Sequence, residues 1–118
     1  MRSAGQLWET RAERWLARRG LQTIERNYHT RLGEIDLIMR DADALVFVEV
    51  KFRKSHDYGS GAEAVTAQKR QRLIRTAQYF LSQHPSANER PCRFDVISIQ
   101  DGMIPRYEWI QNAFDANE

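Results

Sequence analysis

The sequence predicts an α/β protein with three layers, α/β/α, in which a small mixed central sheet lies between two helices. Two segments have the one-sided apolar spacing of amphipathic helices, and strand-like segments rich in β-branched and aromatic residues stand between and after them. Their order along the chain gives a core of αβββαβ, which is typical of a sheet covered by a helix on each face. The length of 118 residues fits one domain, so we expect residues 1–118 to form a single domain.

The first helix is predicted over residues 6–19, because its large apolar side chains recur on one side. Gly20 follows directly, at the position where a helix commonly ends. The apolar stripe consists of Trp8, Ala12, Trp15 and Leu16.

Three strand-like segments follow this helix. Residues 21–30 suggest an irregular strand, and residues 33–39 alternate between two faces. Residues 45–52 are β-branched and apolar, and the polar segment 40–44 before them is turn-like, so these two strands are expected to form a hairpin. The alternation of the first hairpin strand places Ile35, Leu37 and Met39 on one face and Glu34, Asp36 and Ile38 on the other.

The second helix is predicted over residues 67–82, with Thr66 as its N-cap. A loop over 83–91 leads to a strand over 92–99, and residues 107–114 form a last strand or an ordered tail. The side chains expected on the buried face of this helix are Leu73, Ile74, Ala77, Phe80 and Leu81.

Two full charges stand inside an otherwise apolar strand, "VFVEVKFR" at 46–53. A charge in an apolar interior is costly unless it is paired or holds a metal. If the hairpin turn is centred between residues 42 and 43, Asp36 faces Glu49 and Glu34 faces Lys51. Opposed residues have Cβ atoms about 4.5–5.5 Å apart, so two carboxylates there repel each other.

A divalent cation between Asp36 and Glu49 would reverse that repulsion, and Mg²⁺ prefers such oxygen ligands. Lys51 lies on the same strand face as Glu49, so an ammonium would stand beside the ion. A metal that activates water, with an amine that orients the water or stabilises developing charge, can hydrolyse a phosphodiester. The alternative is a solvated sheet face with a Glu34–Lys51 ion pair worth a few tenths of a kcal/mol, roughly.

The charge pattern favours a polyanion as partner. The net charge is only +2, but residues 1–75 hold 15 Lys and Arg against 10 Asp and Glu. Such side chains on the second helix and after the third strand could contact a phosphate backbone, although a solvated helix face explains each of them singly. The candidates for nucleic-acid binding are Arg53, Gln68, Lys69, Arg72 and Arg75.

Other function classes find little support in the sequence. No glycine-rich phosphate loop is present, so we expect no nucleotide cofactor. No apolar run approaches the roughly 20 residues of a membrane helix, and no secretory signal pattern begins the chain. The single cysteine, Cys92, fits a reducing compartment, so the expected location is cytoplasmic and no membrane partner is expected.

A carboxylate strand followed by Glu-x-Lys on the next strand resembles the PD-(D/E)xK nuclease superfamily. Asp36 matches the first acid and 49–51 match the second motif, although Ile35 stands where the superfamily's name has proline. More closely, the chain resembles the YraN-like family of small bacterial proteins. The matching segments are Gly5, Glu9 and Ala12, "RNY" at 26–28, "GEIDLI" at 33–38, "VFVEVK" at 46–51, "KRQRLIRTAQYFL" at 69–81, "RFDVI" at 93–97 and "NAF" at 112–114.

The resemblance implies a restriction-endonuclease-like fold, similar to Holliday-junction resolvases. It implies that Asp36 and Glu49 bind a divalent metal, Mg²⁺ or Mn²⁺, with the main-chain carbonyl of Val50 as a further ligand. It also implies a catalytic role for Lys51, and Glu9 matches a glutamate that approaches the metal from the first helix.

The sequence therefore predicts a Mg²⁺-dependent endonuclease acting on DNA, with branched or structured DNA as a candidate substrate and RNA left open. The alternative is a nucleic-acid-binding module that keeps the fold without turnover, and a third option is a structural partner protein. A homodimer is compatible with cutting two strands, but no segment of the sequence identifies a dimer face.

Overall fold

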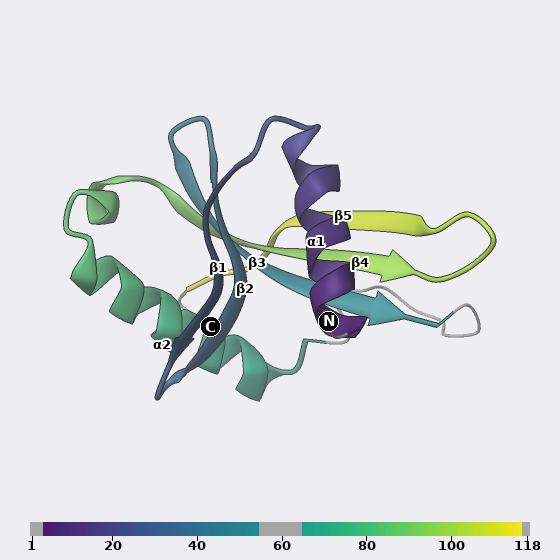
Figure 1. Cartoon of the computed structure of the whole chain (residues 1–118). Helices are drawn as coiled ribbons and strands as arrows, with labels where there is room; N and C mark the ends of the chain where they lie inside the picture. The colour runs from purple at the N-terminus through teal and green to yellow at the C-terminus, as the bar shows by residue number, and fades with distance from the viewer. Residues whose placement is uncertain (1–3, 55–64, 117–118) are drawn as a thin grey trace.

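The computed structural model describes residues 4–54 and 65–116, and these residues form one mixed sheet with a helix on each face (Figure 1). The strands lie side by side in chain order, and only β3 and β4 run parallel. The elements are α1 (Ala4–Ala17), β1 (Gln22–Thr30), β2 (Gly33–Asp41), β3 (Ala44–Arg53), α2 (Ala67–Gln83), the short 3₁₀-helix η2 (Ala87–Glu89), β4 (Cys92–Gln100) and β5 (Arg106–Phe114). The predicted α/β/α layering is confirmed, and the last segment is a strand.

The helix α1 covers one face of the sheet through the predicted apolar stripe. Ala12 and Leu16 are fully buried against Val46 and Val48 of β3 and their neighbours on β2 and β4. Trp8 and Trp15 are half-buried at the edge of this core. This packing fixes the position of Glu9, which lies one turn before the buried part of the helix.

The helix α2 covers the opposite face, and its start is fixed by the predicted cap. The Thr66 side chain accepts a hydrogen bond from the main-chain N–H of Lys69 at 3.2 Å. The crossover from β3 to the parallel strand β4 carries α2 across the sheet. The predicted buried residues pack there as expected, except that Leu81 is only partly buried and Thr76 is buried as well.

The register of the β2–β3 hairpin is the predicted one. Leu37 pairs with Val48, and the ladder continues to Asp41 and Ala44 beside the turn. Ala42 adopts a left-handed conformation with φ of 53°, as a tight hairpin turn requires. The ladder ends at the Leu37–Val48 pair, one step short of the predicted pairing of Asp36 with Glu49.

Beyond that pair the two-face alternation of β2 breaks, which corrects two expectations. Asn27 on β1 is left-handed with φ of 51°, and it lies between the Arg26–Leu37 and Tyr28–Ile35 pairs. Ile35 consequently packs with Ile38 in the core under α2 instead of facing α1. Glu34 likewise does not pair with Lys51, since the β2–β3 ladder has ended before it, and its carboxylate forms an ion pair with His29 at 2.9 Å. The predicted cross-strand pairing of Glu34 with Lys51 is therefore wrong.

The strand β5 is held in place by a buried carboxylate. Asp95 of β4 accepts hydrogen bonds from the side chains of Arg93 and Trp109 and from the main-chain N–H of Asn112, at 2.9–3.2 Å. Asn112 is left-handed with φ of 52°, and the β4–β5 register shifts between Phe94 and Val96. Asp95 thus has a structural role, because it holds β5 against β4. Among the described residues, no helix is long and apolar enough to cross a membrane.

Candidate metal and nucleic-acid site

Two carboxylates meet where the β2–β3 ladder stops. Asp36 Oδ2 accepts a hydrogen bond from the main-chain N–H of Val50 at 2.8 Å, so its side chain bridges the two strands where main-chain pairing has ended. The charge of Asp36 raises the pKa of Glu49, so the two carboxyls lie within electrostatic reach of each other. The hairpin therefore brings the two acids together, although by a bridge across the strand gap and not as a ladder pair.

Glu49 is a buried acid whose charged form is unfavourable. Only 7% of the residue is exposed, and burial together with the neighbouring charge of Asp36 raises the pKa of Glu49 to about 7. The charge of Lys69 acts in the opposite sense. A buried pair of carboxyls, one of them hard to ionise, is a site that a cation would stabilise.

Glu9 approaches the same pair from α1. Burial, the charge of Asp36 and a side-chain hydrogen bond with Asp36 raise the pKa of Glu9 to about 7, and a hydrogen bond from the Asn27 side chain opposes this shift. Asp36 thus lies within electrostatic reach of an acid from the helix and an acid from β3. The sequence expectation that Glu9 lies beside the hairpin acids agrees with this placement, while its role as a ligand stays a prediction.

Two lysine amines adjoin the acids, and one of them was not expected there. Lys51 is half-buried, and burial followed by the neighbouring ammonium of Lys69 lowers the pKa of Lys51. Burial opposes the shift of Lys69, but its contacts with Lys51 and Glu49 raise the pKa of Lys69 overall. Lys69 Nζ lies 3.1 Å from Glu49 Oε1. The sequence placed Lys69 on a general basic surface, because spacing along a helix does not show where that helix crosses the sheet.

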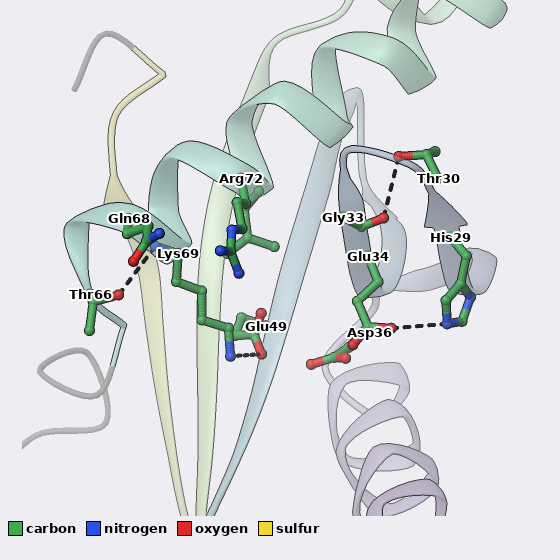
Figure 2. Close-up of a pocket in the computed structure, with 11 residues that line it drawn as sticks. His29, Thr30, Gly33, Glu34, Asp36, Glu49, Thr66, Gln68, Lys69 and Arg72 are labelled. Carbon is green, nitrogen blue, oxygen red and sulfur yellow. Dashed lines mark hydrogen bonds and ion pairs between the residues drawn. The ribbon is translucent and has the colours of Figure 1, made fainter.

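Asp36, Glu49 and Lys69 line a pocket of about 600 Å³ between α2 and the strands β1 to β3, whereas Glu9 and Lys51 are not among its lining residues (Figure 2). Figure 2 shows Glu49 and Lys69 on one side of the pocket and Asp36, Glu34 and His29 on the other. The open volume and the mixture of acids and bases suit a charged, elongated ligand better than an apolar one. The lining residues are His29, Thr30, Gly33, Glu34, Asp36, Glu49, Thr66, Gln68, Lys69, Arg72 and Leu73.

The structure separates the predicted nucleic-acid contacts into two groups. Gln68, Lys69 and Arg72 line the pocket from the first turns of α2, whereas Arg75 lies exposed further along that helix and does not line it. Arg53 lines a different pocket of about 330 Å³, formed with β4 and β5. The predicted α2 contacts Gln68, Lys69 and Arg72 therefore lie at the pocket with the acids and Arg53 does not, while their role in binding nucleic acid stays a prediction.

The donor set is chemically suited to a hard divalent ion. The carboxylates of Asp36 and Glu49 and a main-chain carbonyl are oxygen ligands, which Mg²⁺ and Mn²⁺ prefer. Within residues 4–54 and 65–116, no group of three or more His, Cys, Asp or Glu side chains has the arrangement of a metal site. An ion held here would consequently rely on two acids, main-chain oxygen and water, a mixture that is common for Mg²⁺.

The mixed five-stranded sheet with a helix on each face is that of an α/β protein and is compatible with the restriction-endonuclease-like fold. More specifically, the chain belongs to the uncharacterised protein family UPF0102, the YraN-like family, whose model matches residues 8–99. It is 51% identical over 110 residues to a UPF0102 protein of Saccharophagus degradans, covering 93% of this chain and 91% of the relative. It is 47% identical over 115 residues to a UPF0102 protein of Alcanivorax borkumensis, covering 96% and 92% respectively.

Proposed function

We propose that this protein is a divalent-metal-dependent endonuclease that hydrolyses phosphodiester bonds in DNA. The observation that carries the proposal is that Asp36 and Glu49 line one open pocket together with Lys69, whose Nζ lies 3.1 Å from Glu49. Lys51 is a second amine next to Lys69. Acids that hold a cation and amines that meet a phosphate are the components that phosphodiester hydrolysis needs.

The proposed ligands of Mg²⁺ or Mn²⁺ are Asp36, Glu49 and the main-chain carbonyl of Val50, with Glu9 as an additional acid. When bound, such an ion would lower the pKa of a water molecule and neutralise phosphate oxygens. The Val50 main chain already holds Asp36 in place through its N–H, so the same peptide segment would orient a side-chain ligand and supply a main-chain one.

Lys51 is the proposed catalytic amine. Burial and the neighbouring ammonium of Lys69 lower the pKa of Lys51, which makes it the amine that more readily gives up its proton. A lysine in that state can accept a hydrogen bond from the attacking water and orient the water toward phosphorus.

The proposed path of the DNA runs over the first turns of α2. Gln68, Lys69 and Arg72 line the pocket, and Arg75 extends the basic surface along the exposed side of the helix. Phosphate contacts of this kind position a nucleic acid without reading its sequence, which agrees with a structure-directed substrate such as branched DNA. A cytoplasmic location, which the single cysteine favours, would place the protein where DNA is available.

The first prediction concerns Asp36→Asn. This change removes one negative charge from the metal pair while keeping the size of the side chain, so cleavage should fall at least about 100-fold. Binding to DNA should be unchanged or stronger, because a negative charge leaves the pocket. Purified protein is to be assayed with Mg²⁺ and with Mn²⁺ on linear, flapped and four-way DNA and on RNA.

The matched control is Asp43→Asn, the same substitution at an exposed residue of the hairpin turn, which should cleave like the wild-type protein. If the wild-type protein cuts none of these substrates with either metal, the nuclease proposal fails. Retained binding without cleavage would then favour the second candidate, a non-catalytic nucleic-acid-binding module. That candidate draws support from the finding that no three-acid metal group is present among the described residues.

A further inference from the structure

The ammonium of Lys69 lies beside Glu49, a proposed metal ligand, at a position that a bound metal ion would occupy. Its Nζ lies 3.1 Å from Oε1 of Glu49, a carboxylate that is otherwise buried. An ammonium at hydrogen-bond distance from a ligand oxygen competes with a metal for the same lone pairs and the same negative charge. We propose that Lys69 is an internal counter-ion of the metal centre, which a divalent ion displaces from Glu49 and which then pairs with a substrate phosphate. This inference rests on the proposed nuclease function.

The backbone of Lys69 is fixed, whereas its side chain has room to move. The main-chain N–H is held by the Thr66 cap in the first turn of α2. The side chain is 39% exposed and lines the 600 Å³ pocket (Figure 2). A rotation of the long side chain could therefore take the ammonium from Glu49 into the pocket without a change in the helix.

The charges around the site favour such an exchange. A second amine, that of Lys51, adjoins both the acids and Lys69. A divalent ion added beside Glu49 would repel both amines, and Lys69 is the one whose side chain reaches into the open pocket. Once displaced, it would lie on the same wall as Arg72, where a phosphate group could accept hydrogen bonds from both side chains.

The exchange has a thermodynamic consequence. A metal that frees Lys69 for phosphate should raise the affinity for DNA, and DNA that captures Lys69 should raise the affinity for the metal by the same factor. Without Lys69, this coupling should weaken, while the metal should bind more tightly because it has no internal competitor.

The experiment measures Mn²⁺ binding by titration calorimetry at pH 8.5, where protons compete little with the metal. Lys69→Met should bind Mn²⁺ roughly fivefold more tightly than the wild-type protein, and Lys69→Arg, which keeps the charge, should not. Arg72→Met is the matched control: it removes the same charge from the same pocket wall, one turn away, and should leave the affinity within about twofold.

A second titration repeats the measurement in the presence of a short DNA duplex. The increase in Mn²⁺ affinity caused by DNA should be smaller in Lys69→Met than in the wild-type protein. Circular dichroism checks that each variant is folded. If Lys69→Met does not fold, a crystal structure of the wild-type protein with Mn²⁺ decides: Nζ of Lys69 should have left Glu49, and an intact ion pair beside a bound metal overturns the inference.

The outcomes separate this inference from the proposed function. If the wild-type protein binds Mn²⁺ and Asp36→Asn does not, the metal centre stands. Equal affinities of the wild-type protein, Lys69→Met and Arg72→Met would then overturn only the role of Lys69. If neither the wild-type protein nor Lys69→Met binds Mn²⁺, the counter-ion role and the metal-dependent function fall together.

Discussion

At the scale of single residues, the ionised carboxylate of Glu49 destabilises the folded protein. Its carboxyl is buried beside Asp36, which raises the pKa of Glu49 to about 7 from an ordinary value of 4.5, and the single contact with Lys69 offsets only part of this shift. A residue that is unfavourable for folding but sits beside another acid is typical of functional sites, where stability is given up for chemistry.

The shift predicts how stability depends on pH in the absence of metal. The unfolded chain loses the proton of Glu49 near pH 4.5 and the folded chain near pH 7, so the folded state binds more protons between these values. The contribution of Glu49 is therefore fully present below pH 4.5 and is lost as the pH rises through 7. Over this window the free energy of unfolding should fall by up to about 3 kcal/mol from this residue.

Glu49→Gln should remove that loss. The amide can donate a hydrogen bond to Asp36 and carries no charge, so the variant should be about 1–3 kcal/mol more stable than the wild-type protein at pH 8. The difference should shrink toward pH 4.5. Urea unfolding in EDTA buffers across this range measures it, with Glu25→Gln, an exposed glutamate of β1, as the control that keeps the wild-type profile. Parallel profiles for Glu49→Gln and the wild-type protein would contradict the prediction.

At the scale of elements, the β2–β3 hairpin shows which features can be predicted from the sequence and which cannot. The register of β2 and β3 follows from local alternation and a turn centred between residues 42 and 43, and it is the observed one. The end of the ladder at Leu37 does not follow from alternation, because it depends on a left-handed Asn27 in a neighbouring strand and on the bond from Asp36 to the Val50 main chain. These contacts are tertiary, so local periodicity misplaced Ile35.

The helix α2 shows the same division between local and tertiary information. Its start, its cap and most of its buried face follow from the sequence. Its crossing point over β3 does not, and that point decides that Lys69 meets Glu49 while Arg75 remains outside the pocket. The two hairpin acids of the candidate site could thus be predicted from the sequence, whereas its second amine could not.

The crossing point depends on a glycine at the start of β2. Gly33 has a positive φ of 152°, and a Cβ at this position would stand 3.0 Å from Oγ1 of Thr76 on α2. That hydroxyl is buried and is fixed by its own bond to the carbonyl of Arg72, at 2.7 Å. A methyl group at residue 33 would therefore push α2 away from the hairpin.

Gly33→Ala should lower the free energy of unfolding by about 1–3 kcal/mol, from backbone strain and from the close contact. Gly102→Ala is the control, since a Cβ there would meet its nearest atom at an ordinary 3.7 Å, and it should change stability by less than about 0.5 kcal/mol. Chemical unfolding of both variants at one pH gives the comparison. An unchanged stability of Gly33→Ala would mean that the helix can move without cost.

At the scale of the whole molecule, the candidate site combines residues from the sheet and from the helices on its two faces. The helix α1 supplies Glu9, the hairpin supplies Asp36 and Glu49, and α2 supplies Lys69 from the opposite face of the sheet (Figure 1). The acids meet where the β2–β3 ladder has ended, which lets side chains from the two faces approach one another. Folding of the whole chain is therefore required before any of these groups can act together.

The net charge of +2 is too small to attract DNA by itself, so binding should depend on where the positive charges lie. The segment of α2 from 69 to 75 holds four basic residues and no acid. We therefore expect DNA affinity, measured by fluorescence anisotropy, to fall steeply as salt rises. The double variant Arg72→Gln with Arg75→Gln should reduce the slope of log K against log[salt] by about 2, since each phosphate contact contributes roughly 0.9.

The control for this last prediction removes two charges from the far end of the other helix. Arg14 lies in the last turn of α1 and Arg18 lies just beyond it, and both are exposed. Arg14→Gln with Arg18→Gln makes the same change in net charge, so the slope should stay at the wild-type value if α2 is the contact surface. Equal losses in both double variants would point to non-specific attraction of the whole molecule, and a flat salt dependence of the wild-type protein would favour a structural partner protein that does not bind nucleic acid.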